Sequence, residues 1–234
     1  MYDRAMVQAI PNTRDWRPQQ FGRRAARHVE DPVIEPLWSG VRVLAHVSAD
    51  AVELVDAEGG AQDWPDVIRE LAGSIDAGAA VLDGYITTEA ANEGVGLYGG
   101  ISVERPTAVD VARQMLWFGG GRNRRQELID SLEADMARPF APGEEVVFVA
   151  VDLLALDGEP LLDVPLLERK RLLDAVVIEG DRVRRGIHVR PPIDVWINTW
   201  RTLGFRSLAY KDANSRYIPG ERNDAWATWW IPNR

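Results

Sequence analysis

The stretch FVAVDLLALDG at residues 148–158 is followed by LLDVPLLERKRLL at residues 161–173. The first stretch belongs to an apolar run, residues 145–154, which predicts a buried strand, and Asp157-Gly158 after it is typical of a turn. Pro165 then precedes apolar residues at helical spacing, so a helix is predicted over residues 166–176. This strand, turn and helix form the unit from which the rest of the fold is predicted.

Outside this unit, strands and helices are predicted in no regular alternation. Alternating apolar and polar residues over 41–55 predict two strands with a turn at 48–50. The other predicted elements are a short helix at 66–71, a buried strand at 79–86, a helical segment at 108–136 with a break at three glycines, a short helix at 195–203 and a strand at 203–211. This mixture favours the α+β class over a doubly wound sheet.

The composition limits the chemistry available to the chain. The 234 residues suffice for one sizeable domain or two small ones. Cysteine is absent, which excludes disulfides, thiolate zinc sites and cysteine nucleophiles. The three histidines, His28, His46 and His188, are scattered singly, so no metal site is predicted.

Charge and hydropathy indicate the setting in which the protein works. The formal net charge is −9, which disfavours non-specific binding of nucleic acid by the body of the molecule. No apolar run approaches the roughly 18 residues that a membrane span needs, and no secretory leader is recognisable. We therefore expect a cytoplasmic protein that does not bind a membrane. Of the 27 basic residues only Lys170 and Lys211 are lysines, which is typical of GC-rich coding and favours a bacterial source.

Three stretches, taken together, resemble the adenylation domain of ATP-dependent DNA ligases and, more broadly, the ligase and mRNA-capping nucleotidyltransferases. The longest covers residues 148–173, the second is KDANSRYIPGER at 211–222 with Trp226 after it, and the third is EPLWSGVR at 35–42. The resemblance covers roughly residues 34–230. It implies an α+β nucleotidyltransferase fold of two packed antiparallel sheets flanked by helices, with a pocket between the sheets.

Pro11 and Pro18 interrupt any apolar periodicity at the start of the chain, so residues 1–30 are expected to form an N-terminal arm that docks through Trp16 and Phe21. The other boundaries are expected from the resemblance. Residues 31–234 form the adenylation domain, with an inserted segment at about 92–136, and no C-terminal oligonucleotide-binding domain is expected.

The resemblance also implies a lysine that accepts AMP from ATP, but the positions that carry this chemistry are replaced. Transfer of AMP needs an uncharged amine as nucleophile and cations or metal-bound carboxylates around the phosphates. The degenerate positions are Leu37 at the nucleophilic lysine, Ser39 at an acidic residue, Ala57 at an arginine, Tyr85 and Arg206 at carboxylates, and Thr228 and Trp230 at two lysines. The nucleotide-binding remnant consists of Gly40, Arg42, Val151 and Lys211, with Val151 at the place of an adenine-stacking ring.

Other charged and aromatic groups have two interpretations each. Lys211 either holds a phosphate in the pocket or forms a surface ion pair, and Lys170 is predicted to be a solvated charge. Arg122, Arg124 and Arg125 are candidates for nucleic-acid contact. A second set of arginines forms either a basic edge or, as we favour, a solvated strand face: Arg182, Arg184, Arg185 and Arg190. The tryptophans at the C-terminal end are expected to pack in the core or an interface rather than to stack on bases: Trp196, Trp200, Trp226, Trp229 and Trp230.

The replacement of these motif residues favours a catalytically inactive ligase-like protein, a pseudo-ligase. Such a protein would act as a binding or scaffolding subunit in DNA repair or nucleic-acid processing. No catalytic residue and no cofactor are expected. A protein partner is expected, and DNA contact through local arginine clusters stays open. Two alternatives also stay open: an active ATP-dependent DNA ligase or nucleotidyltransferase with a displaced nucleophile such as Lys211, which would need ATP and Mg²⁺, and a nucleic-acid end-binding module.

Overall fold

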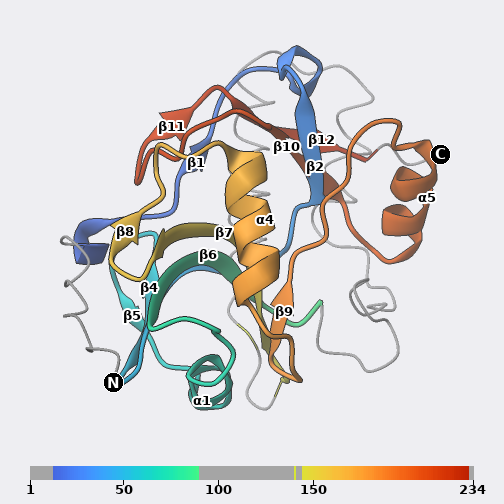
Figure 1. Cartoon of the computed structure of the whole chain (residues 1–234). Helices are drawn as coiled ribbons and strands as arrows, with labels where there is room; N and C mark the ends of the chain where they lie inside the picture. Colours follow the sequence, from blue (N-terminus) through green and yellow to red (C-terminus); the bar gives the residue numbers. More distant parts are fainter. Residues whose placement is uncertain (1–12, 90–139, 141–143, 232–234) are drawn as a thin grey trace.

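Two main sheets form the molecule in the computed structural model, which describes residues 13–89, 140 and 144–231 (Figure 1). The larger sheet has the order β5-β4-β3-β6-β7-β8, with β9 pairing parallel to β7. Its strands are β3 (Val41–Ser48), β4 (Val52–Asp56), β5 (Ala61–Gln62), β6 (Ala79–Thr87), β7 (Val147–Leu156), β8 (Glu159–Pro160) and β9 (Val183–Arg185). The smaller sheet has the order β12-β10-β2 and contains β2 (Pro32–Pro36), β10 (Ser207–Asp212) and β12 (Trp226–Trp230).

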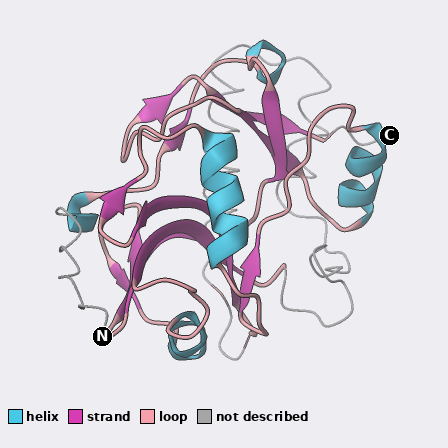
Figure 2. Cartoon of the chain, viewed as in Figure 1, coloured by secondary structure: helices cyan, strands magenta, loops and turns pink. Residues whose placement is uncertain are grey.

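The middle of the larger sheet is buried on both faces. Every residue of β6, and all but the last of β7, is buried, in line with their nearly continuous apolar sequences. Helix α4 (Leu166–Val176) packs on β7, and α1 (Pro65–Leu71), which begins with proline at its first position, packs near β4. Figure 2 shows α4 running across the strands at the centre of the molecule, with α1 and α5 (Asp194–Thr202) at its periphery.

The α+β class and the two main sheets predicted from the sequence are confirmed, and so are most of the predicted elements within the described residues. The hairpin of β3 and β4, helix α1, strands β6 and β7, and helix α4 lie where they were predicted. The strand predicted from residue 203 begins instead at Ser207, because α5 runs to Thr202 and Gly204 turns the chain with a φ of 93°. The segments at 92–136 and 108–136 lie outside the described residues.

The described part of the N-terminal arm packs against the body of the domain. It contains two short 3-10 helices, η1 (Thr13–Asp15) and η2 (Ala26–His28), and strand β1 (Gln20–Phe21), which pairs parallel with β11 (Arg222–Asn223). Trp16 and Phe21 lie against a buried cluster that includes Tyr217 and Trp226. The arm thereby places Gln20 and Phe21 beside the site described next. Among the described residues, no helix has the length and apolar character needed to cross a membrane.

Candidate functional site

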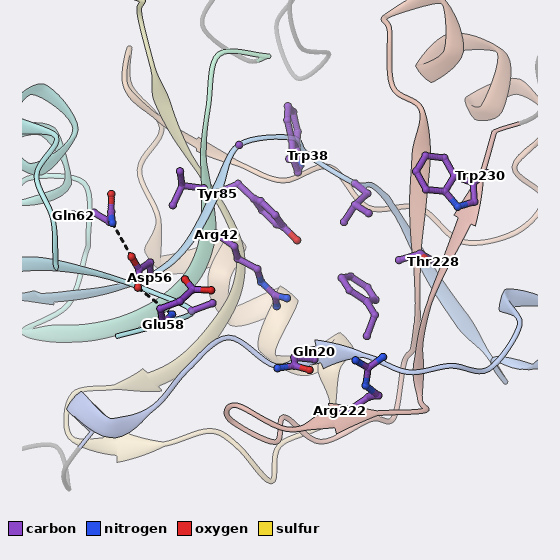
Figure 3. A pocket seen from close by; sticks show the side chains of 15 residues that line it. Gln20, Trp38, Arg42, Asp56, Glu58, Gln62, Tyr85, Arg222, Thr228 and Trp230 are labelled. Atoms are coloured by element: carbon purple, nitrogen blue, oxygen red, sulfur yellow. Dashed lines mark hydrogen bonds between the residues drawn. The ribbon is translucent and has the colours of Figure 1, made fainter. Parts of the chain in front are cut away.

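A pocket of about 560 Å³ has walls from both sheets (Figure 3). This volume lies within the range of small-ligand sites. One wall comes from β3, the turn after β4, and β6, and the other comes from β12, while β1 and β11 complete it. The lining residues are Gln20, Phe21, Leu37, Trp38, Gly40, Val41, Arg42, Asp56, Ala57, Glu58, Gln62, Tyr85, Arg222, Thr228 and Trp230.

The segment that joins β2 to β3 brings Leu37 into this pocket. The backbone amide of Leu37 donates to the carbonyl of Ser207 at 3.0 Å, which ties the segment to the smaller sheet. Gly40 then turns the chain into β3 with a φ of 111°. A Cβ atom at Gly40 would lie 2.1 Å from the carbonyl oxygen of Ile86, so glycine is required at this position.

Arg42 lines the pocket, but Asp83 binds its guanidinium group. Nε donates to Asp83 Oδ1 at 3.0 Å, Nη2 donates to Oδ2 at 2.5 Å, and Nη1 donates to the carbonyl of Gln19 at 2.6 Å. Burial alone would lower the pKa of Arg42, but Asp83, together with Tyr85 and Tyr217, outweighs burial and holds that pKa well above its usual value. The positive charge of Arg42 is therefore neutralised by a fully buried carboxylate.

Tyr85 occupies the position where the resemblance implies a carboxylate. Its ring lies 5.7 Å from the Arg42 guanidinium carbon, within the range of a cation–π contact. Burial, only partly opposed by the charge of Arg42, raises the pKa of Tyr85 to about 12. The hydroxyl group is therefore uncharged at neutral pH and supplies no negative charge for a metal ion.

Both lysines of the chain are buried and share one carboxylate, that of Glu35 on β2. Lys170 Nζ lies 2.7 Å from Glu35 Oε1, and Lys211 Nζ lies 3.0 Å from Glu35 Oε2. Burial would raise the pKa of Glu35, but the two ammonium groups outweigh it and lower that pKa to about 2. Burial in turn lowers the pKa of Lys211, whose Nζ lies 4.4 Å from the centroid of a Trp226 ring.

This arrangement corrects the predictions made for the two lysines. Lys170 is 1% exposed, so its prediction as a solvated charge is wrong. The physical reason is that Lys170 lies on the buried face of α4 together with Leu166, Arg169 and Leu173. Lys211 is 2% exposed and is not in a surface ion pair, and it does not line the pocket.

The structure brings some of the predicted site residues together and separates others. The pocket collects Leu37, Gly40, Arg42, Tyr85, Thr228 and Trp230. Ser39 is half-buried, and its backbone amide donates to Glu89 Oε2 at 2.8 Å. Val151 is buried in the apolar core around β7, and Arg206 is exposed just before β10. Arg122, Arg124 and Arg125 lie outside the described residues.

The sequence did not single out several residues that line the pocket. Phe21 was expected only to dock the arm, and Glu58 and Arg222 were given no role. These residues come from three separate elements, and only the packing of the sheets and the arm brings them together. Trp38 is the one with a local signal, because it directly follows Leu37 in the motif.

Three arginines of the second set are paired with carboxylates. Arg182 pairs with Glu145 at 3.0 Å, Arg185 pairs with Glu179 at 3.1 Å, and Arg190 pairs with Asp31. This pattern agrees with a solvated strand face rather than a basic edge. In the described part of the chain, no group of three or more histidine, aspartate or glutamate side chains is arranged to hold a metal ion.

Most of the C-terminal tryptophans pack in the core, as expected. Trp200 and Trp226 are fully buried, Trp196 lies 5.7 Å from Trp200 between ring centroids, and Trp229 lies against Tyr210. Trp230 differs from the others because it lines the pocket.

Comparison with known proteins agrees with this geometry. The DNA ligase of Pyrobaculum neutrophilum is 28% identical over 200 residues, which are 83% of this chain and 30% of that protein. The DNA ligase of Thermococcus onnurineus is 26% identical over 202 residues, which are 84% of this chain and 31% of that protein. The chain therefore spans about a third of the length of these relatives.

Solved structures share the fold. The ligase domain of LigD from M. tuberculosis superposes with a TM-score of 0.59 at 21% identity, and 92% of this chain matches 59% of that chain. A mycobacterial DNA ligase D in complex with ATP and MES gives a TM-score of 0.59 at 20% identity, with 92% of this chain matching 60% of that chain. The ATP dependent DNA ligase domain family matches residues 23–228. This chain belongs to that family.

Proposed function

We propose that this chain is a catalytically inactive ligase-like domain whose pocket binds a partner and does not transfer a nucleotide. One observation carries the proposal: Leu37 stands in the pocket at the nucleophile position, while both lysines of the chain are buried against Glu35. A leucine side chain has no lone pair with which to attack a phosphorus atom. Removal of a covalent nucleophile alone can cost about 10⁶ in rate.

The electrostatics of the pocket support the same conclusion. Four lining residues stand where the resemblance implies cations, and all four are uncharged: Leu37, Ala57, Thr228 and Trp230. Arg42 also lines the pocket, but its charge is compensated by Asp83. Tyr85 provides no carboxylate for a metal ion. Asp56, Glu58 and Arg222 also line the pocket, but they do not stand at the positions where the resemblance implies metal carboxylates and phosphate cations. We therefore propose that the domain needs neither ATP nor Mg²⁺.

The competing function is an active ligase or nucleotidyltransferase in which Lys211 replaces the missing nucleophile. Its amine lies 3.0 Å from a carboxylate oxygen of Glu35 and 4.4 Å from the centroid of a Trp226 ring, and Lys211 is not among the residues that line the pocket. To attack a nucleotide, Lys211 would have to break this ion pair and leave Glu35 with Lys170 alone. The buried position of Lys211 therefore favours a structural role.

An adenylation assay tests the proposal. The chain is incubated with ATP labelled at the α-phosphate and with Mg²⁺ or Mn²⁺, and it is then analysed by gel and by intact mass, with an active ATP-dependent DNA ligase in parallel as positive control. We expect no covalent AMP on this chain. An AMP adduct on the wild-type protein would overturn the proposal, and its loss in Lys211→Ala would assign the reaction to that lysine.

The biological role that we propose is that of a binding or scaffolding subunit in DNA repair or nucleic-acid processing. Membership of the ligase family supports this setting. The neutralised arginines around β9 favour a protein partner over direct binding of nucleic acid. Co-purification from the native host is expected to yield a stable protein partner, and recovery of the chain without any partner would count against a scaffolding role.

A further inference from the structure

We infer that the pocket binds a polypeptide segment in which an aromatic side chain enters between the aromatic walls and an adjacent basic residue pairs with Glu58. This inference rests on the proposed function, because it assumes that no nucleotide occupies the pocket. Three features of the described residues carry it: the aromatic lining, the balance of charge, and the exposed carboxylate at the edge.

The aromatic lining comes from four different elements. Phe21 lies on β1, Trp38 follows β2, Tyr85 lies on β6 and Trp230 ends β12, and Leu37 lines the same pocket. Figure 3 shows the side chains of Trp38, Tyr85 and Trp230. Aromatic rings in the wall of a pocket favour a planar aromatic or aliphatic group at that wall over a hydrated, charged one. Two of the rings, Tyr85 and Trp230, stand at positions where the resemblance implies charged side chains. Aromatic surface therefore replaces charge at these two positions of the pocket.

The charges of the pocket disfavour a polyphosphate. Two cations, Arg42 and Arg222, line it together with two carboxylates, Asp56 and Glu58. Since Asp83 neutralises Arg42, the carboxylates outnumber the cations left to meet a ligand. The formal net charge of the chain, −9, adds to this local preference. An interface of this kind attracts a basic partner and repels an acidic one.

Glu58, the exposed carboxylate at the edge, lies on a turn that the Asp56 side chain stabilises. Asp56 accepts hydrogen bonds from the Gln62 side chain at 2.7 Å and from the backbone amides of Glu58 and Gly60 at 3.0 and 2.6 Å. This turn presents the exposed side chain of Glu58 at the pocket. In Figure 3 Glu58 lies beside Asp56, with the Arg42 side chain between it and Tyr85. An acidic edge and aromatic rings in one pocket match two neighbouring side chains of one peptide, the first aromatic and the second basic.

Two blocked tetrapeptides test the inference, Gly-Phe-Lys-Gly and Gly-Phe-Glu-Gly, each acetylated and amidated. Binding is followed in ¹⁵N NMR spectra through the indole N–H signals of the tryptophans, assigned by substitution. We expect the lysine peptide to shift the Trp38 and Trp230 signals and to bind about fivefold more tightly than the glutamate peptide, the most that one exposed charge pair gives. The Trp64 signal, from outside the pocket, should not move.

Matched variants locate the site. Glu58→Lys should reverse the preference between the two peptides, and Trp230→Ala should weaken both by about tenfold. Leu37→Lys, which adds a cation to the pocket, should weaken the lysine peptide more than the glutamate peptide. Ile178→Ala, on an exposed side chain elsewhere, should leave both affinities unchanged. The amide dispersion of each variant confirms that it is folded.

ATP and adenosine serve as competing probes of the same signals. Stronger binding of ATP than of the lysine peptide, stronger binding of adenosine than of either peptide, or equal peptide affinities in wild type and Glu58→Lys would overturn the inference. Each of these results differs from the AMP adduct that would overturn the proposed function. A chain that forms no adduct and binds neither peptide would leave the inactive domain in place and reject this ligand.

Discussion

Lys211 and Glu35 form a buried ion pair between two neighbouring strands, with Nζ 3.0 Å from Oε2, and Lys170 of α4 approaches the other oxygen of the same carboxylate. The group joins the smaller sheet to the helix that packs on the larger one. Two ammonium ions around a single carboxylate carry a net positive charge that is buried from water. We therefore expect Glu35 to be essential to stability, whatever the pocket binds.

Replacing Glu35 with glutamine should destabilise the fold by about 3–5 kcal/mol, because it leaves two buried ammonium groups without their counter-charge. Urea unfolding followed by circular dichroism measures this change. Glu168→Gln is the matched control, since Glu168 pairs with Arg171 on the exposed side of α4 and its loss should have a much smaller effect. Equal losses of stability in the two variants would contradict a central role for Glu35.

The same carboxylate predicts a dependence of stability on pH. The pKa of Glu35 is about 2 in the folded protein, against an ordinary value of 4.5, so the folded state favours its charged form. Its contribution, on the order of 3 kcal/mol, should be fully present above pH 4.5 and should be lost as the pH falls toward 2.

Other carboxylates titrate in this range, so the useful quantity is the difference in unfolding free energy between wild type and Glu35→Gln. Urea unfolding of both proteins between pH 5.5 and about 2.5 measures it, since protonated glutamate resembles glutamine. The difference should shrink steadily as the pH falls below 4.5. A difference that stays constant over this range would show that Glu35 does not have a lowered pKa.

Gly40 offers a test of the turn that brings Leu37 to the pocket. Gly40→Ala places a Cβ atom 2.1 Å from the carbonyl oxygen of Ile86 at a φ of 111°, so a loss of more than about 2 kcal/mol is expected. Gly73→Ala is the control, because its Cβ would meet only the Glu70 carbonyl oxygen at 3.8 Å. Thermal unfolding should place the Gly73 variant near wild type and the Gly40 variant well below it.

The local sequence pattern predicted both ends of helix α4 correctly, but Lys170 within it was wrongly predicted to be exposed. Pro165 and the apolar spacing give both ends of the helix. Lys170 lies on the same face of the helix as Leu166 and Leu173, which indicates a buried position. Its charge, however, led to the prediction that it is exposed to solvent. The counter-ion that allows burial, Glu35, lies on a distant strand, so no local pattern reveals it.

The candidate site could be predicted only where a motif passes through it. Leu37, Arg42 and Tyr85 were found because each lies in a stretch that resembles a motif of the family. The partner of Arg42, Asp83, lies on β6, and the register of β3 against β6 brings the two together. Glu58 and Phe21 become neighbours of these residues only through the packing of the arm and the sheets, a tertiary effect that local sequence does not encode.

Restoring the nucleophile alone should not restore the reaction. In Leu37→Lys the new amine lies in the pocket beside Arg42, whose charge Asp83 compensates, and beside the uncharged Tyr85, Thr228 and Trp230. None of these side chains supplies a carboxylate or an uncompensated cation for phosphoryl transfer, and the charges that remain in the pocket, those of Asp56, Glu58 and Arg222, do not stand at the positions that the resemblance implies. Labelling with ATP carrying a radioactive α-phosphate should therefore stay at the wild-type background, while the stability of the folded variant is checked by thermal unfolding.

A combined variant with Leu37→Lys, Tyr85→Glu, Arg206→Glu, Thr228→Lys and Trp230→Lys rebuilds five of the seven charges that the family resemblance implies, and leaves Ser39 and Ala57 unchanged. The effects of catalytic groups that act together are strongly non-additive. Any labelling should therefore appear in the combined variant and not in the variants with single substitutions. The same set with Leu37 retained is the matched control, since it restores the surroundings without an amine. Labelling of Leu37→Lys alone would show that the pocket still stabilises the transferring phosphate, and the inactive character of the domain would then rest on a single side chain.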